Sequence, residues 1–252
     1  MARTWRAALL AAALLALLAA HHWRGWWAPA LQRQMQDQPC PADPAADPRL
    51  VPGDEGGLCA HRADNARRLT ADTRTELVLL GDSIVAGWQQ VEPARFTGAW
   101  ANRGVDGQAS AHLLARMRQD VIALRPRAVL IAAGLNDIIA RRGVISPADY
   151  VANIESLVDL AQAHGITVIL ATLPPAERFP TRPRIAPQPR IDQLNAQLRA
   201  LARRRGLVLA DFHAALAAPG LRIDGLHPNA EGYRRLAPVV EQALAQTRKE
   251  PD

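Results

Sequence analysis

Short apolar runs recur along the chain after residue 75, and most of them end at a glycine or another small residue. Runs of this length that are bounded by turn residues are typical of buried strands. The runs cover residues 76–80, 127–133, 165–172 and 206–210, with a weaker one near Trp100. We therefore predict a sheet that is built from these segments.

Longer segments with apolar residues at helical spacing lie between these runs or after them. They cover residues 109–124, 147–164, 191–205 and 230–246. Ser146-Pro147 is typical of an N-cap followed by proline at the first helical position, and Asn229 is placed to cap the last helix. Strands that alternate with helices indicate right-handed βαβ units, so we predict an α/β fold with a mainly parallel sheet covered by helices on both faces.

The first 30 residues differ from the rest of the chain. Arg3 and Arg6 precede residues 7–20, which contain only alanine and leucine, and a basic region before an apolar one is typical of an export signal. The apolar run is shorter than the roughly 20 residues of a membrane-spanning helix, but the tryptophans at positions 23, 26 and 27 favour a membrane interface. We expect either cleavage, near Ala20 or at residues 28–30, or a retained N-terminal membrane anchor. In both cases the body is exported and is periplasmic, secreted or anchored to the inner membrane facing outward.

The two cysteines lie in a lead-in segment, residues 31–75, that precedes the regular pattern. Cys40 and Cys59 flank a stretch rich in proline, aspartate and glycine. In an exported chain, an even number of cysteines favours a disulfide over a metal site, although two free thiols are the alternative. A closed loop of this size stabilises the folded chain by about 3 kcal/mol in the chain-entropy model.

Composition and charge narrow the class of protein. The 252 residues are 49% hydrophobic and 21% charged, which excludes a disordered or fibrous chain and allows one large domain. The net charge of +6 is almost entirely due to arginine, since Lys249 is the only lysine. The arginines form pairs and triplets rather than a long run, so we expect no nucleic-acid partner, although a basic surface attracts polyanions in general. The oligomeric state stays open.

Polar residues follow the predicted strands at the points where ligands bind in parallel sheets, beyond the carboxyl ends. Ser83 follows the first strand, and Asp224 and His227 share a late loop. A serine hydroxyl becomes a good nucleophile when an imidazole takes its proton and a carboxylate orients that imidazole. The chain has four serines, and the other three fall inside predicted helices or at a cap, which leaves Ser83 as the candidate nucleophile.

Acyl transfer also requires hydrogen-bond donors that stabilise the oxyanion of the tetrahedral intermediate. Three groups at the predicted strand ends can supply them: the backbone N–H of Ser83, a glycine N–H in the 104–107 loop and the side-chain amide of Asn136. Each feature alone is also explained by an ordinary polar turn. Their common order along the chain favours one site.

These blocks resemble the SGNH branch of the GDSL lipase/acylhydrolase family. The resemblance covers roughly residues 76–245 and rests on Gly81-Asp82-Ser83-Ile84, Asn102-Arg103-Gly104-Val105-Asp106-Gly107, Gly134-Leu135-Asn136-Asp137 and Asp224-Gly225-Leu226-His227-Pro228. It implies a flavodoxin-like three-layer α/β/α catalytic domain over residues 76–247. It also implies that Gly107, rather than Gly104, is the oxyanion-hole glycine. The chain departs from the family pattern at Ile84 and at Gln108-Ala109, where an Asp-Thr pair is frequent.

The resemblance implies a serine ester hydrolase in which Ser83 attacks, His227 transfers protons and Asp224 orients His227, with no cofactor and no metal. The alternatives are an O-acyltransferase on an envelope glycan and a non-catalytic envelope binding module. We expect a small-molecule, glycan or lipid ester as substrate. Asp106 and Asp137 are expected to form structural hydrogen bonds beneath the site. The proline-rich segment 173–190 is expected to form its rim, where Arg178, Arg182 and Arg184 would meet the substrate.

Overall fold

The structure is a computed structural model that describes residues 40, 54, 56–71, 74–141 and 143–248. All of these belong to one compact unit, Cys40–Asp252. The predicted export segment, residues 1–30, lies outside the described residues, so cleavage and anchoring stay predictions. No helix within the described ranges combines the length and the apolar character that crossing a bilayer requires.

Five parallel strands form a sheet in the order β2-β1-β3-β4-β5. Their bounds are Leu77–Gly81 for β1, Trp100–Gly104 for β2, Ala128–Ala132 for β3, Thr167–Ala171 for β4 and Val208–Ala210 for β5. Each strand overlaps its predicted run, and the prediction of a mainly parallel sheet is confirmed. This is the order of flavodoxin-like folds. Strand β2 lies on one side of β1, and the later strands β3, β4 and β5 are added on the other side.

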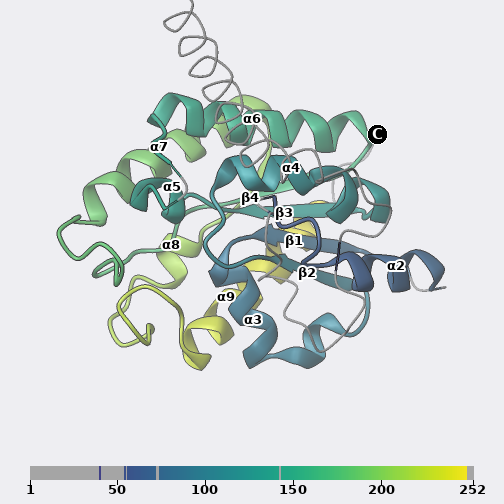
Figure 1. Cartoon of the computed structure of the whole chain (residues 1–252), viewed down its shortest axis with the longest axis horizontal. Helices are drawn as coiled ribbons and strands as arrows, with labels where there is room; N and C mark the ends of the chain where they lie inside the picture. Colours follow the sequence, from purple (N-terminus) through teal and green to yellow (C-terminus); the bar gives the residue numbers. More distant parts are fainter. Residues whose placement is uncertain (1–39, 41–53, 55, 72–73, 142, 249–252) are drawn as a thin grey trace, which may run out of the picture. The chain divides into compact units, whose positions relative to one another are not determined.

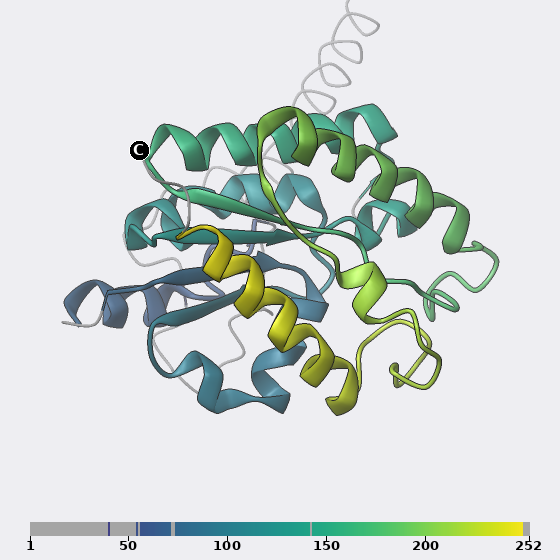
Figure 2. The ribbon, with the colours of Figure 1, turned by 180° about the vertical axis from the view of Figure 1, so that it is seen from behind.

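Helices cover both faces of this sheet (Figures 1 and 2). Helices α3 (Ser83–Val91) and α9 (Ala230–Gln246) lie on one face. Helices α4 (Ser110–Asp120), α6 (Pro147–Ala163) and α7 (Gln188–Arg205) lie on the other. The result is the three-layer α/β/α architecture that the sequence predicts.

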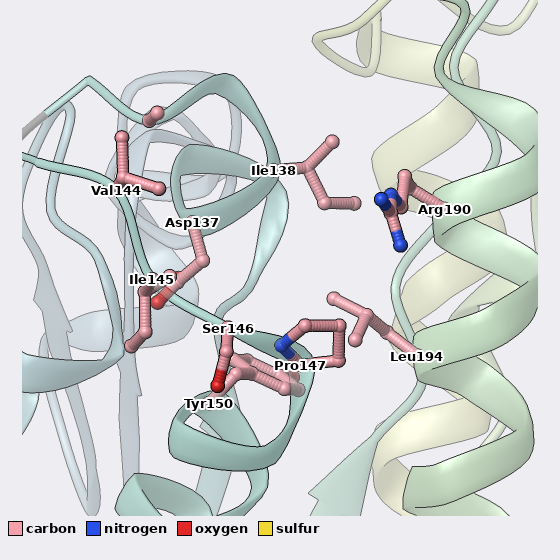
Figure 3. Close-up of a pocket in the computed structure, with 10 residues that line it drawn as sticks. Asp137, Ile138, Val144, Ile145, Ser146, Pro147, Tyr150, Arg190 and Leu194 are labelled. Atoms are coloured by element: carbon pink, nitrogen blue, oxygen red, sulfur yellow. The ribbon is translucent and has the colours of Figure 1, made fainter.

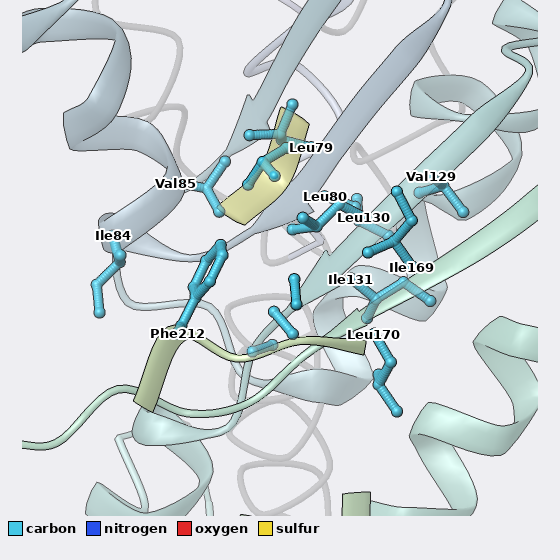
Figure 4. Close-up of a cluster of buried hydrophobic side chains, with 14 of the residues drawn as sticks. Leu79, Leu80, Ile84, Val85, Val129, Leu130, Ile131, Ile169, Leu170 and Phe212 are labelled. Atoms are coloured by element: carbon cyan, nitrogen blue, oxygen red, sulfur yellow. The ribbon is translucent and has the colours of Figure 1, made fainter. Parts of the chain in front are cut away.

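The core lies between the sheet and these helices. All five residues of β1 are buried, because a parallel strand between two helical layers has no face in contact with water. Figure 4 shows Leu79 and Leu80 of β1, Leu130 of β3 and Ile169 of β4 in this cluster, together with Phe212 from the short helix after β5. Burial of such side chains stabilises the fold by roughly 25 cal/mol for each Å² of apolar surface removed from water.

Helices α6 and α9 begin directly after the capping residues that the sequence predicts, Ser146 and Asn229. The Ser146 side chain accepts a hydrogen bond from Asp149 N at 3.1 Å, and the Asn229 side chain accepts one from Gly232 N at 2.9 Å, as predicted. Helix α4 ends at Asp120, four residues before its predicted end, and the 3-10 turn η3 (Ile122–Leu124) follows. Helix α7 begins at Gln188, three residues before its predicted start.

Five elements lie outside the predicted helical segments: α2 (Arg62–Thr70), α3 (Ser83–Val91), η2 (Pro93–Phe96), α5 (Leu135–Ile139) and α8 (Phe212–Ala215). Helix α2 lies inside the predicted lead-in segment and contacts α4 and η3. The same segment contains the predicted disulfide, which joins Cys40 to Cys59. Helix α2 of the lead-in segment is therefore packed against the α/β unit that follows it.

The strand register brings the candidate loops together. Gly81 at the end of β1 pairs with Gly104 of β2 on one side and with Ala132 of β3 on the other. The segments that follow these three strands are helix α3 with Ser83, the loop with Gly107, and helix α5 with Asn136. They therefore leave the same edge of the sheet side by side, at the β1/β3 switch point where ligands bind in such folds.

Candidate active site

Ser83 is the first residue of α3, directly after β1. Asp82 caps this helix, because its side chain accepts a hydrogen bond from Ile84 N at 3.0 Å. The turn from strand to helix places the Ser83 Oγ 3.0 Å from Nε2 of His227, a residue 144 positions later in the chain. The structure thus brings the candidate nucleophile and the candidate base within hydrogen-bond distance.

The other ring nitrogen of His227 lies 2.7 Å from Oδ2 of Asp224. The remaining carboxylate oxygen, Oδ1, accepts hydrogen bonds from Leu226 N at 2.9 Å and from His227 N at 2.8 Å. The turn that folds the carboxylate back toward the ring passes through Gly225, whose φ of +84° is disfavoured for residues with a side chain.

Partial burial favours the neutral form of Asp224, but the hydrogen bonds from His227 and Leu226 outweigh it and hold the pKa of this carboxyl below its usual value. Asp224 is therefore a carboxylate at neutral pH. A carboxylate at this position fixes the proton of His227 on Nδ1, so that Nε2 accepts the hydrogen bond from the Ser83 hydroxyl.

The predicted oxyanion donors lie around the same serine. The side-chain amide of Asn136 donates from Nδ2 to the backbone carbonyl of Gln108 at 3.0 Å, which fixes its orientation and leaves its second N–H available. Within the described residues, the backbone N–H groups of Ser83 and Gly107 have no hydrogen-bond acceptor. Ser83, Gly107 and Asn136 all line one pocket, so the three donors can face a common oxyanion.

This catalytic pocket has a volume of about 280 Å³. Ile84, Leu135 and Leu226 of the predicted motifs line it, as do Pro180 and Thr181 of the segment 173–190. Ile139 and Arg141, which belong to no predicted motif or segment, also line it. Arg141 follows the C-terminal end of α5, and its side chain packs against Gly107. Its position depends on the left-handed backbone of Ala140 (φ 53°), for which no sequence signal exists.

The segment 173–190 borders the pocket, but through different residues from those predicted. Pro180 and Thr181 line it, whereas Arg182 and Arg184 are exposed and are not among its described lining residues. Arg178 donates from Nε to the backbone carbonyl of Asp224 at 2.9 Å, so it supports the turn that carries the carboxylate. Contact of the three arginines with a substrate stays a prediction.

Asp137 has a structural contact of the expected kind. Its carboxylate accepts hydrogen bonds from the Ser110 hydroxyl at 2.6 Å and from Ser110 N, and this ties α5 to the start of α4. Burial raises the pKa of Asp137, while the bonds from Ser110 oppose that change. Asp106 is exposed and lines the catalytic pocket.

A network of buried polar groups lies behind residues 104–109, the loop from the end of β2 to α4 that carries Gly107 and is called the oxyanion loop below. Arg116 of α4 is fully buried and donates to Gln108 Oε1 at 2.6 Å, to Asp120 Oδ2 at 2.8 Å and to the Gly81 carbonyl at 2.9 Å. Asp120 also accepts a hydrogen bond from Asn65 Nδ2 at 2.6 Å, and Asn65 belongs to α2. The network therefore connects the lead-in segment with the strand that precedes the candidate nucleophile.

A second pocket, of about 170 Å³, is lined by other residues of α5 (Figure 3). Figure 3 shows Ile138 of α5 on the side of Arg190 of α7, whereas Asp137 lies on the opposite side of this space, beside Ile145. It contains none of the candidate catalytic residues. Among the residues that the structure describes, no group of three His, Cys, Asp or Glu side chains is arranged to hold a metal ion.

The pKa of the Asp82 carboxyl is raised, whereas the pKa of the Asp224 carboxyl is lowered. Complete burial raises the pKa of Asp82 to about 7, although the hydrogen bond from Ile84 N and the nearby His227 oppose the change. In the unfolded chain the same carboxyl titrates near its ordinary value of about 3.9. Its contribution to stability is therefore fully present below about pH 4 and is lost as the pH rises to about 7.

We expect Asp82→Asn to remove this pH dependence, because asparagine keeps a cap oxygen and carries no charge. The free energy of unfolding of the variant, minus that of the wild type, should rise by roughly 1.4 kcal/mol for each pH unit between about pH 4 and 7. Urea unfolding of both proteins at pH 5, 6, 7 and 8 measures this difference. A difference that is the same at all four values would show that Asp82 is not responsible.

The comparisons of this chain with known proteins agree on one family. A model of the GDSL-like lipase/acylhydrolase family matches residues 79–235. A crystal structure of a candidate acylhydrolase from Bacteroides fragilis is 34% identical, covers 77% of this chain and 98% of its own, and superposes with a TM-score of 0.72. A GDSL-like lipase from Bacteroides thetaiotaomicron is 32% identical, with coverage of 76% and 98% and a TM-score of 0.70.

More distant structures share the fold. The acetylxylan esterase Axe2 from Geobacillus stearothermophilus is 22% identical, covers 68% of this chain and 94% of its own, and gives a TM-score of 0.53. None of the curated proteins compared with the chain matches it. The matched range of the family model contains Ser83, Gly107, Asn136, Asp224 and His227.

Proposed function

The chain belongs to the GDSL-like lipase/acylhydrolase family, and on that basis we propose that it is a serine ester hydrolase that works through an acyl-enzyme on Ser83. One observation carries the proposal. An unbroken hydrogen-bond chain runs from Ser83 through His227 to Asp224, with distances of 3.0 Å and 2.7 Å, and it opens into the pocket that Gly107 and Asn136 line. A structural turn requires no such chain.

In the first half of the proposed reaction, the Ser83 Oγ attacks the carbonyl carbon of the ester while its proton passes to Nε2 of His227. The carbonyl oxygen becomes an oxyanion, which accepts hydrogen bonds from the N–H groups of Ser83 and Gly107 and from the Asn136 amide. The bond to the alcohol then breaks. His227 returns its proton to the leaving alkoxide, and the acyl group stays on Ser83.

In the second half, a water molecule attacks the acyl carbon and gives a proton to His227. The bond to the Ser83 Oγ breaks, the carboxylic acid leaves, and the proton returns to the serine. Asp224 stays ionised throughout and stabilises the imidazolium that forms in each half. A sugar hydroxyl in place of this water would make the protein an acyltransferase.

We also propose that the protein works in the cell envelope. The basic and apolar pattern of residues 1–20 supports export, and the Cys40–Cys59 disulfide is the kind of bond that persists in oxidising compartments. The N-terminal residue of protein isolated from intact cells tests this proposal. A start near residue 21 or 31 would establish export with cleavage, and an intact Met1 in the cytoplasmic fraction would contradict export.

We expect the full chain to hydrolyse p-nitrophenyl esters in water without any acceptor alcohol. Release of p-nitrophenol from acetyl, butyryl, octanoyl and palmitoyl esters measures this, and the chain-length profile defines the acyl group that the pocket takes. Activity that appears only when a sugar acceptor is added would favour acyl transfer instead. Inactivity on every ester, with and without acceptor, would favour the non-catalytic binding module.

A further inference from the structure

Gln108 directly follows the candidate oxyanion glycine and is buried, with 2% of its surface exposed. Its backbone carbonyl accepts the hydrogen bond from the Asn136 amide at 3.0 Å. Its own side chain is not among the described residues that line the catalytic pocket. One residue thus sits between two oxyanion donors, Gly107 and Asn136, without facing the substrate.

Both ends of the Gln108 side chain are held. The Oε1 atom accepts a hydrogen bond from Nε of the buried Arg116 at 2.6 Å. The Nε2 atom donates to the backbone carbonyl of Gly56, 52 positions earlier in the chain, at 3.0 Å. A side chain fixed at both ends leaves its backbone little freedom, so these two bonds define where the Gly107 N–H and the Gln108 carbonyl lie.

The segment that contains Gly56 is itself fixed by the disulfide. Cys59 is bonded to Cys40, and the Asp54 carboxylate accepts hydrogen bonds from Leu58 N at 2.7 Å and Cys59 N at 2.8 Å. The segment packs tightly on the glutamine. A Cβ atom on Gly57, which has a φ of +69°, would lie 2.3 Å from Gln108 Nε2.

A second contact joins the same segment to the strand beneath the loop. The His61 ring lies with Nε2 at 3.1 Å from the Gly104 carbonyl, at the end of β2. Burial lowers the pKa of His61 to about 4, so this histidine is neutral at physiological pH and donates one N–H to that carbonyl. The lead-in segment therefore contacts the oxyanion loop at its beginning, Gly104, and near its end, Gln108.

We propose that Gln108 is a positioning residue through which the segment closed by the Cys40–Cys59 disulfide holds the Gly107 and Asn136 donors in the geometry that the oxyanion requires. This inference rests on the proposed ester hydrolysis. Oxyanion donors act at about 2.7–3.1 Å from the position of the developing charge, so a small displacement of the loop weakens transition-state binding more than substrate binding. Loss of the support therefore lowers kcat and leaves KM nearly unchanged.

The experiment compares Gln108→Met with Gln119→Met in the full, oxidised chain, using p-nitrophenyl acetate as the probe. Methionine has a similar length but forms neither hydrogen bond. Gln119 is the matched control, because its Nε2 donates to the Leu58 carbonyl of the same segment at 2.9 Å without contacting the oxyanion loop. We expect Gln108→Met to lower kcat about 10- to 100-fold with KM within about threefold of the wild type, and Gln119→Met to change neither by more than about twofold.

A second variant disturbs the same contact by changing Gly57, the residue that packs against the Gln108 side chain. Gly57→Ala introduces a Cβ against Gln108 Nε2, and it should lower kcat with little change in KM. The melting temperature of each variant shows whether it is folded. A folded Gln108→Met or Gly57→Ala protein with the kcat of the wild type would overturn this inference while leaving ester hydrolysis intact. A wild-type chain that hydrolyses no ester would overturn both.

Discussion

Replacing Ser83 by alanine is expected to lower kcat for p-nitrophenyl acetate about 10,000-fold or more. The alanine keeps the fold, because the Ser83 side chain has no other hydrogen-bond partner among the described residues than His227. It removes the atom that would form the acyl-enzyme, and residual catalysis then comes only from the oxyanion donors and from substrate binding. Initial rates of p-nitrophenol release at saturating substrate measure the effect.

Ser156→Ala is the matched control for this experiment. Ser156 is exposed on α6, and its hydroxyl donates to the Ala152 carbonyl of its own helix, away from the catalytic pocket. The control should retain the kcat of the wild type. Equal activity of Ser83→Ala and the wild type would identify Ser83 as the wrong nucleophile.

Replacing Arg116 by methionine is expected to have the largest effect on stability. Among the described residues, the substitution leaves the side chain of the buried Asp120 with the hydrogen bond from Asn65 alone, and it removes the donors to Gln108 and the Gly81 carbonyl. Breaking a buried ion pair from one side typically costs about 3–5 kcal/mol, because the remaining charge is uncompensated. The free energy of unfolding from urea denaturation, with the disulfide intact, measures the loss.

Two further variants show whether the loss of stability comes from the broken Arg116–Asp120 ion pair or from replacing any arginine of this helix by methionine. Arg118→Met makes the same change on an exposed residue of the same helix and should cost less than about 0.5 kcal/mol. The double variant Arg116→Met/Asp120→Leu removes both charges and should recover a large part of the lost stability. If Arg116→Met were as stable as Arg118→Met, the buried pair would contribute nothing.

Strands β1, β3, β4 and β5 could be predicted because the sheet lies between two layers of helices, so these strands are mainly apolar runs. Strand β2 gave only a weak pattern, because it contains Asn102 and Arg103. Helix α2 could not be predicted in this way. Its only buried residue is the polar Asn65, and contacts such as those of Asp64 and Asn65 with Arg103 hold it, rather than an apolar stripe. Helix α5 has five residues, which is too short for helical periodicity to show.

The candidate triad could be predicted because serine and histidine are scarce in the chain, and because Ser83 lies at a strand end while Asp224 and His227 share one late loop. The supporting contacts could not. Gln108 contacts Gly56 and Arg116 through side-chain geometry that no local pattern encodes, and Arg141 reaches Gly107 only because the chain turns at Ala140. At the rim, the position of the segment 173–190 after β4 predicts substrate contacts for Arg178, Arg182 and Arg184, and the pocket itself is lined by Pro180 and Thr181 of the same segment.

Covalent labelling of Ser83 tests the central claim most directly. The full chain would be incubated with an alkyl fluorophosphonate, which reacts with activated serines and mimics the tetrahedral intermediate. Intact-mass and peptide-mass spectrometry would then locate the adduct. The proposed mechanism predicts one phosphonyl group per chain, on the peptide that contains Ser83, and none on the Ser83→Ala variant. A wild-type protein that acquires no adduct, or equal labelling of both proteins, would contradict it.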